Sequence, residues 1–482
     1  DVAESARHVN EETRLKYRYL DLRNKRMAQN LVFRNNFVKY IRDFLTEQGF
    51  IEVETPMLTK TTMEGARCFL VPSRLHPGKF YALPMSPQQY KQLLMVGGVD
   101  KYFQIARCLR DEDQRGDRQP EFTQLDLEMS FIHRDDILNL VEELFTSAVE
   151  KLAPNKKIMK KPWPRLPYDE VIKKYGVDKP DLRYGLEIQE ITELVKDCGF
   201  EVFTKAIKAG GVVRAINVPG AGEKLTRSAI DELTELAKKH KAKGLAYIFV
   251  EKDGSFRSPL TKFLGDDMTA KIAQAVKANK GDVIFFGADN RFVVEESLGQ
   301  LRIELAKRLQ LADPNVLAFA FVIDFPLFEE NKMENGHYAP SHHMFTTPRP
   351  EDMHLLDTDP PKVKSWQYDF VCNGYEVGGG SIRIHDRDLQ EKIFGMIGFK
   401  EEQREYFHHM LEAFEYGAPP HGGMAPGIDR LCMVIQGEPN IREVIAFPKT
   451  GDAEELLMRS PSAADPEHIK ELHIKLDLPK TK

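Results

Sequence analysis

The sequence RDEDQRGDRQPEFTQLDLEM at Arg110–Met129 predicts a charged loop followed by a strand. The segment before it, 102–110, is rich in aromatic and β-branched residues and predicts a partner strand. The loop 111–119 is too polar to bury, and Pro120 cannot continue a ladder of hydrogen bonds. Side chains alternate between the two faces of a strand, so one face of this hairpin carries a ring, an amide and two acids: Phe122, Gln124, Asp126 and Glu128.

A solvated sheet face would show the same alternation, so composition and the other motifs must decide. The 482 residues are 42% hydrophobic and 29% charged, which is typical of a globular protein with more than one domain. The formal net charge of −6 gives no support to a protein that coats nucleic acid. No apolar run is long enough for a bilayer, and five scattered cysteines without a C-x-x-C pair favour a reducing, cytoplasmic compartment.

Two stretches upstream combine a helix with a sharp boundary. Apolar residues at three- and four-residue steps predict a helix over 27–48, followed by a strand over 50–54. In the second stretch, Ser86 is the predicted N-cap of a helix, with a proline in its first turn. Gln88 and Lys91 then share one helix face.

The stretch QYDFVCNGYEVGGGSIR at 367–383 carries two acids, a glycine run and an arginine. Asp369 and Glu376 are seven residues apart and would lie on opposite faces of a regular strand. If both bind one magnesium ion, a bulge near Gly374 must shift the register, and we predict that bulge. The glycine run lets the backbone approach a small ligand, and Arg383 can bind a carboxylate through two hydrogen bonds.

The stretch GAPPHGGMAPGIDRLCMVI at 417–435 predicts a helix that begins near Asp429, with Arg430 in its first turn. Helix N-termini favour acids and attract phosphates, so a bound phosphate would explain the arginine. An ion pair between Arg430 and Asp429 would explain it equally well.

In this order, the stretches resemble motifs 1, 2 and 3 of the class II aminoacyl-tRNA synthetases, in the bacterial aspartyl-tRNA synthetase form. The resemblance implies an α+β fold, an antiparallel sheet flanked by helices, with an inserted α+β domain of the GAD type. Two positions depart from the family pattern in the loop 61–74, where Met63 and Cys68 replace proline and aspartate. In SHHMFT at 341–346, Met344 replaces another proline.

The resemblance also implies a domain organisation. We expect a linker at 1–26, the first part of the catalytic domain at 27–180, the inserted domain at 181–310, and the second part of the catalytic domain at 311–482. In the family an anticodon-binding barrel precedes the linker, and that barrel is not in the sequence given.

Roles for single residues follow from the resemblance. Arg110 and Arg430 are the expected catalytic residues. The expected ATP site comprises Arg110, Glu112, Gln119, Phe122, Glu376, Gly427, Ile428, Asp429 and Arg430. The expected aspartate site comprises Glu64, Ser86, Gln88, Lys91, Arg110, Asp126, His342 and Arg383. Asp369 and Glu376 are the expected magnesium ligands, and the loop 114–118 is expected to meet the tRNA acceptor end.

The expected function is the ATP-dependent ligation of aspartate to tRNA(Asp), by a homodimer, with tRNA(Asn) left open as a second acceptor. A lysine in the pocket favours aspartate over asparagine, because its ammonium forms an ion pair with a side-chain carboxylate but not with a neutral amide. One alternative is a synthetase-derived aspartate–ammonia ligase, which would make asparagine. Another is a non-catalytic RNA-binding relative, which the retained acids and Arg430 disfavour.

Overall fold

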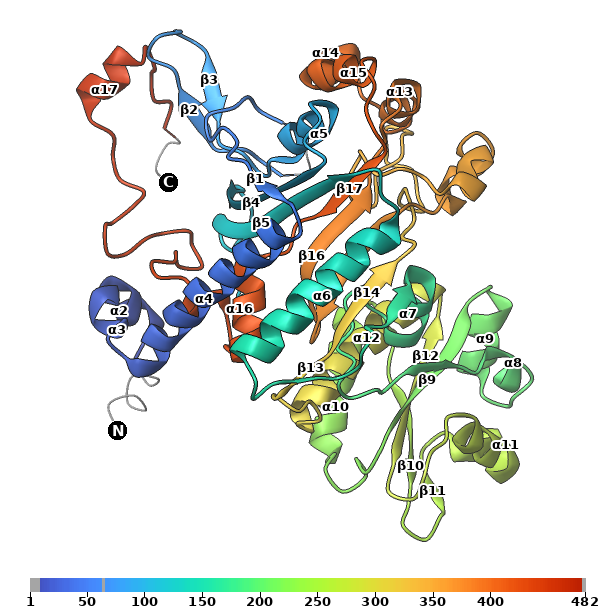
Figure 1. Ribbon diagram of the computed structural model, residues 1–482. Helices are drawn as coiled ribbons and strands as arrows, with labels where there is room; N and C mark the ends of the chain where they lie inside the picture. The colour runs from blue at the N-terminus through green and yellow to red at the C-terminus, as the bar shows by residue number, and fades with distance from the viewer. Residues whose placement is uncertain (1–8, 63–65, 479–482) are drawn as a thin grey trace. The chain divides into compact units, whose positions relative to one another are not determined.

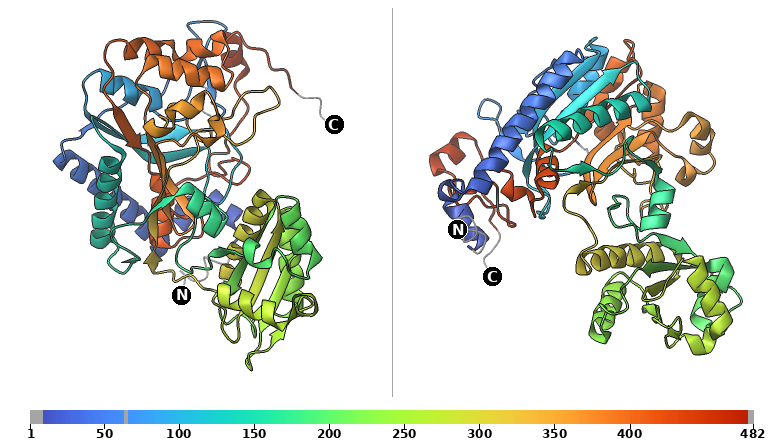
Figure 2. Two further views of the ribbon diagram at one scale, coloured as in Figure 1. Left: turned by 90° about the vertical axis from the view of Figure 1, so that its right-hand side faces the viewer. Right: turned by 60° about the horizontal axis from the view of Figure 1, so that its bottom comes forward.

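The computed structural model describes residues 9–62 and 66–478 and divides the chain into two compact units. Unit 1 consists of Asp1–Lys157, Asp324–Phe370 and Glu376–Lys482, and unit 2 of Ile158–Ile323 and Val371–Tyr375. Figures 1 and 2 show the ribbon from three directions. Among the described residues, no helix combines the length and the apolar character needed to cross a membrane.

Unit 1 contains a mostly antiparallel sheet, and the predicted hairpin forms two of its neighbouring strands. Its strands follow the order β1 (Ile51–Glu52), β4 (Lys101–Leu109), β5 (Glu121–Ser130), β17 (His421–Met424), β16 (Tyr375–Ile382) and β15 (Gln367–Cys372). β1 is parallel to β4, whereas β4 and β5 are antiparallel with Gln104 opposite Asp126. The prediction of two strands joined by a charged loop is therefore confirmed.

Two long helices lie side by side along one face of this sheet (Figures 1 and 2). They are α4 (Lys25–Glu47) and α6 (Arg134–Leu152). Phe145 of α6 packs between Phe37 of α4 and Phe370 of β15, with ring centroids 5.9 and 5.4 Å away. The helix predicted at 27–48 is confirmed, but the strand predicted at 50–54 is reduced to the two residues of β1. The helix α16 (Ile428–Gln436) packs against α4 and β5.

Unit 2 contains a second sheet, in the order β11 (Phe256–Arg257), β10 (Ala246–Val250), β12 (Val283–Asp289), β9 (Val212–Val218) and β8 (Ile188–Glu190), with antiparallel neighbours. Alternating residues of β12 enter two cores. Phe285 packs with α10 (Arg227–Lys239) and α12 (Arg291–Arg308), and Phe286 packs with α9 (Glu201–Lys208) and α11 (Thr261–Ala275).

The other elements are shorter. The remaining helices are α2 (Glu11–Lys16), α3 (Arg18–Asp21), α5 (Gln88–Val96), α7 (Tyr168–Tyr175), α8 (Thr192–Val195), α13 (Arg387–Met396), α14 (Glu401–Arg404), α15 (His408–Phe414) and α17 (Pro466–Glu471). The 3-10 helices are η2 (Pro350–Leu356), η3 (Pro360–Lys362), η4 (Glu405–Phe407) and η5 (Ile441–Glu443). The remaining strands are β2 (Leu70–Pro72), β3 (Phe80–Ala82), β6 (Lys157–Ile158), β7 (Arg165–Pro167), β13 (Val316–Leu317) and β14 (Phe319–Ile323).

Candidate active site

A cavity of about 420 Å³ opens in unit 1 over the acidic face of β5. Most of the predicted site residues line it: Ser86, Gln88, Lys91, Arg110, Glu112, Gln119, Phe122, Asp126, His342, Glu376, Arg383, Gly427, Asp429 and Arg430. Ile428 is fully buried and is not part of the lining. Glu64 lies outside the described residues. The hairpin face is thus the wall of a site, and the alternative of a solvated face is wrong.

Four buried charges form a cluster at the cavity, and three of them, Lys91, Asp126 and Arg383, line it. The Lys91 ammonium lies 2.8 Å from Asp126 and 3.1 Å from Glu128. Arg383 donates to both oxygens of Glu128, at 2.9 and 3.2 Å, and to the hydroxyl of Ser381. Each of the four side chains is at most 4% exposed. Two cations and two acids are therefore held with little access for water, which strengthens each interaction.

Burial and pairing shift the proton equilibria of this cluster. Burial alone would raise the pKa of Glu128, but the nearby Arg383 and Lys91 charges lower it to about 2. For Asp126, burial outweighs the attraction of Lys91 and raises the pKa. Burial, together with Arg383, Lys91 and Arg110, lowers the pKa of His343 to about 3. Glu128 is therefore the permanent counter-ion of the two cations, and His343 is neutral at physiological pH.

The helix α5 supplies Gln88 and Lys91 from its first turn, as predicted. It begins one residue later than expected, so Pro87 occupies the N-cap position and Ser86 does not. The Ser86 hydroxyl accepts a long hydrogen bond, 3.4 Å, from the backbone N–H of Gln88. The predicted cap is therefore wrong by one residue, although Ser86 still lines the cavity.

Two arginines, Arg110 and Arg430, line the same cavity. The Arg110 guanidinium lies 5.1 Å from the centroid of the Phe122 ring. Arg430 donates to the backbone carbonyls of Asp117 (3.1 Å) and Glu376 (2.7 Å), and pairs with the Asp117 carboxylate at 3.2 Å. It does not pair with Asp429.

Asp429 has a structural role instead. Its carboxylate pairs with Arg34 of α4 and accepts the backbone N–H of Thr123 at 2.7 Å. The alternative of an Arg430–Asp429 ion pair is therefore wrong. Asp429 fixes the start of α16 against β5, which places Arg430 beside the charged loop.

Asp369 and Glu376 lie on one face of the sheet because of a hairpin that we did not predict from the sequence. The chain reverses at Asn373 and Gly374, which both have positive φ (52° and 87°), and β15 and β16 form a hairpin. The predicted bulge is therefore wrong, because a tight turn leads into a second strand. A Cβ built on Gly379 would lie 3.2 Å from Asp369 Oδ1 and 3.7 Å from Glu376 Oε1.

This pair of carboxylates fits a magnesium ion. Asp369 Oδ1 accepts a hydrogen bond from Gln367 Nε2 at 3.0 Å, and Oδ2 lies 3.5 Å from His342 Nε2. No group of three metal-binding side chains occurs among the described residues. One or two carboxylates, completed by water and phosphate oxygens, are what Mg²⁺ commonly accepts. Gly379 leaves the space in front of them free of a side chain.

Some functional side chains were missed at the sequence level. Glu128 holds both Lys91 and Arg383, and its alternation with Asp126 on one strand face was the available signal. Asp117 was hidden inside a charged loop. His343 lines the cavity beside His342. Gln119 and Lys449 exchange two hydrogen bonds, at 3.0 and 2.7 Å, across 330 residues, which no local pattern could show.

The antiparallel sheet of unit 1 holds a buried lysine and a buried arginine in ion pairs, and Arg430 lies beside the charged loop. This is the arrangement expected of a class II aminoacyl-tRNA synthetase. Residues 10–451 match the family described as tRNA synthetases class II (D, K and N), and the chain belongs to this family. The family resemblance seen in the sequence is confirmed.

Individual relatives cover nearly the whole chain. The Aspartate--tRNA(Asp/Asn) ligase of Rubrobacter xylanophilus is 55% identical, across 98% of the chain and 78% of the relative. The enzyme of the same name from Anoxybacillus flavithermus is 54% identical, across 97% and 78%. The Aspartate--tRNA ligase of Geobacillus kaustophilus is 51% identical, across 97% and 79%.

Proposed function

We propose that this chain activates L-aspartate with ATP and transfers the aspartyl group to the 3′ end of tRNA(Asp). The relatives named above support the reaction. The observation that carries the choice of amino acid is the pair of cations on the cavity wall, Lys91 and Arg383, which Glu128 holds from outside the lining. An ammonium has three donors, and two acids accept from Lys91, so donor capacity is left for the side-chain carboxylate of a ligand.

The remaining predicted roles fit the placement of the residues. Arg383 and Lys91, with Gln88, Ser86, Asp126 and His342, surround the space for aspartate. Phe122, Arg430, Glu112 and Gln119 line the same cavity and would bind the nucleotide. A magnesium ion on Asp369 and Glu376 would neutralise phosphate charge.

The first step forms a bond between an oxygen of the aspartate α-carboxylate and the α-phosphorus of ATP, and breaks the bond to the β-phosphate bridge, so pyrophosphate leaves. Both reactants are anionic, and the Arg110 guanidinium on the cavity wall would stabilise the charge on the α-phosphate. In the second step a ribose hydroxyl of the tRNA attacks the acyl carbon and AMP leaves. Positioning and charge stabilisation account for the protein's part in both steps.

We further propose that the loop 114–118 meets the acceptor end of the tRNA. Gly116 is held in place by a hydrogen bond, because its carbonyl accepts the backbone N–H of Ile441 at 3.0 Å. Arg115 is exposed, and Arg118 pairs with Glu112 at 3.0 Å. An exposed arginine on an anchored loop suits a backbone phosphate.

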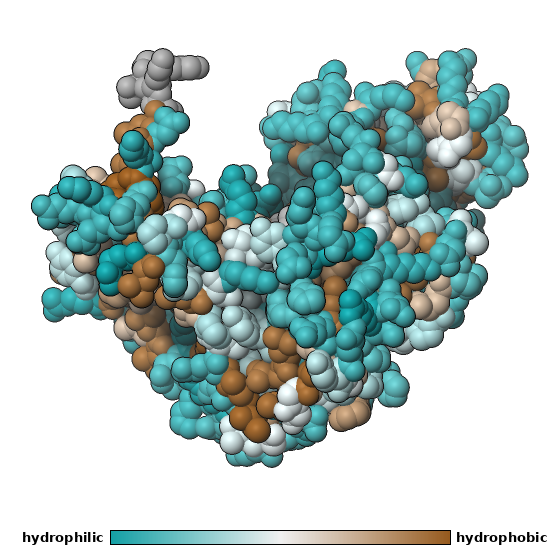
Figure 3. Space-filling view, turned by 90° about the horizontal axis from the view of Figure 1, so that it is seen from above, coloured by the Kyte–Doolittle hydropathy of each residue, from teal (hydrophilic) through white to brown (hydrophobic). Residues whose placement is uncertain are grey.

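We also propose a homodimer in the cytoplasm. Unit 1 exposes Val32 of α4 and Ile51 of β1, with 60% and 56% of their surfaces accessible, and nearby Leu58 is 53% exposed. Figure 3 shows hydrophobic residues gathered in patches between hydrophilic ones. Exposed apolar patches mark protein interfaces. The free cysteines of the described residues fit a reducing compartment.

The test is aspartylation of purified tRNA(Asp) and tRNA(Asn) with labelled aspartate. Labelled tRNA(Asp) supports the proposal, and label on tRNA(Asn) would show that the second acceptor is also used. Formation of free asparagine from ammonia, with no labelled tRNA, would favour the ammonia ligase instead. Light scattering of the same preparation checks the dimer.

A further inference from the structure

Unit 2 contains a cavity of about 700 Å³, larger than the active-site cavity, that the proposed function does not use. It lies at the end of the second sheet where β10 begins at Ala246 while β12 continues past its partner Phe286 to Asp289. The missing length of β10 leaves a space beside β12. Helices α9 and α12 close this space from two sides, so it is a hollow of the fold and not a gap between loops.

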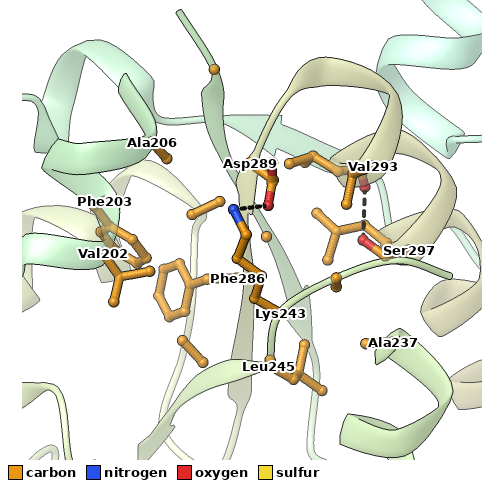
Figure 4. A pocket seen from close by; sticks show the side chains of 18 of the residues that line it. Val202, Phe203, Ala206, Ala237, Lys243, Leu245, Phe286, Asp289, Val293 and Ser297 are labelled. Atoms are coloured by element: carbon orange, nitrogen blue, oxygen red, sulfur yellow. Dashed lines mark hydrogen bonds and ion pairs between the residues drawn. The ribbon is translucent and has the colours of Figure 1, made fainter. Parts of the chain in front are cut away.

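The interior of this cavity is apolar. Figure 4 shows Val202, Phe203 and Phe286 on one side, and Val293 and the helix that carries Ser297 on the other. Phe203, Phe286 and Leu298 are at most 2% exposed, so they form a fixed floor. Pockets of this size and lining, with few polar groups, are typical of small-molecule sites.

The charged residues that line the cavity are Lys205, Lys243 and Asp289. Lys205 is paired at 2.6 Å with Glu201, which lies outside the lining, so Lys243 and Asp289 are the charged pair within the lining itself. Lys243 extends past the apolar groups to Asp289, and their ion pair measures 2.9 Å (Figure 4). The Lys243 side chain is 87% exposed and that of Asp289 only 18%, so solvent and ligands reach the ammonium first. The segment 238–243, KKHKAK, brings further lysines to the same end of α10.

We propose that this cavity binds a small amphipathic anion, with its apolar body between α9 and α12 and its negative group on Lys243. An ammonium has three donors, and Asp289 is the one acid within ion-pairing distance of Lys243 among the described residues. A ligand carboxylate or sulfonate can therefore bind the ammonium without breaking the Asp289 pair. No residue of this cavity is among those proposed to bind aspartate or ATP, so the proposal does not depend on the proposed function.

The test uses 1-anilinonaphthalene-8-sulfonate, whose fluorescence rises in apolar surroundings, titrated into the full chain. We expect saturable binding that Ala206→Phe weakens at least tenfold, because position 206 lines the cavity on α9 and a ring there fills it. Lys243→Ala should weaken binding about threefold to fivefold, the size expected for one exposed charge pair. Lys252→Ala is the matched control, since Lys252 is also an exposed lysine of unit 2 paired with an acid, Glu223, and should bind as the parent does.

Charge selectivity is tested by displacing the dye with decanoate or decylamine. Decanoate should displace it at least fivefold more effectively, and Lys243→Glu, at an exposed position that folding does not need, should reverse that preference. Circular dichroism confirms that each variant is folded. Equal binding by Ala206→Phe and the parent would overturn the proposed location. Equal displacement by the two decyl compounds, or an equal loss in Lys252→Ala, would overturn the preference for an anion.

Discussion

The two cavities of this protein differ in the residues that line them: those of unit 1 are largely polar or charged, and those of unit 2 are largely apolar. The cavity of unit 1 is lined by buried charged groups, such as Lys91, Asp126 and Arg383, each of which is paired with an opposite charge. The cavity of unit 2 is lined mainly by aromatic and aliphatic side chains, and its two lysines, Lys205 and Lys243, are exposed and paired with acids. A buried charge is costly unless it is paired, so the first cavity can tolerate few substitutions. The second can change its lining with little effect on chemistry in unit 1.

The largest effect is expected from Lys91→Met. This change removes the cation between two fully buried acids, and breaking such a group typically costs about 3–5 kcal/mol. Because the ammonium is also the proposed partner of the substrate carboxylate, we expect kcat/KM for aspartate in ATP–pyrophosphate exchange by the folded variant to fall about a thousandfold or more. Lys174→Met removes an exposed lysine that is paired with Glu170, and it should leave exchange unchanged. Near-normal exchange by Lys91→Met would show that Lys91 does not bind the side-chain carboxylate of the substrate.

Glu128→Gln tests a positioning residue, since Glu128 acts through Arg383 and Lys91. The amide cannot neutralise either cation, so Arg383 loses its orientation. We expect KM for aspartate to rise about a hundredfold, while KM for ATP changes less than threefold. Parallel changes in both constants would mean that the carboxylate supports the fold as a whole. Steady-state exchange at varied aspartate and varied ATP separates the two outcomes.

The pH dependence of the unfolding free energy tests regions that are stabilised by buried ion pairs. Glu443, which pairs with Arg14 and Arg26, has its pKa lowered from 4.5 to about 2; burial opposes this shift, and the two arginines cause it. A depressed pKa stabilises the folded state above the ordinary pKa, and this contribution is lost as the pH falls from about 4.5 to about 2. Glu443→Gln should therefore flatten the dependence of the unfolding free energy on pH in that window. An unchanged slope, measured by urea unfolding, would contradict this account.

The smallest effect is expected from Ala206→Phe, which fills the cavity of unit 2. Exchange with aspartate should stay within twofold of the parent value, because no residue of that cavity lines the active site. A loss greater than tenfold in a folded variant would show that the two cavities are coupled.

The contrast also explains what the sequence could reveal. The hairpin and the helix at 27–48 were predictable from the spacing of apolar residues, and most of the active-site lining followed from the family resemblance of the motifs. Asn373 and Gly374 were misread as a bulge, since a two-residue turn and a bulge both need positive φ. The cavity of unit 2 was not predicted, because Phe203 and Phe286 look like ordinary core residues. Its space depends on where β10 begins, and this is a property of the tertiary structure.

ATP–pyrophosphate exchange without tRNA measures directly whether the charged cavity activates aspartate. The amino acid is aspartate in one series and asparagine in the other, with magnesium present in both. We expect exchange with aspartate and at least about a hundredfold less with asparagine, because Lys91 and Arg383 can pair with a carboxylate but not with an amide. Equal exchange with both amino acids, or no exchange by the folded protein with either, would contradict it.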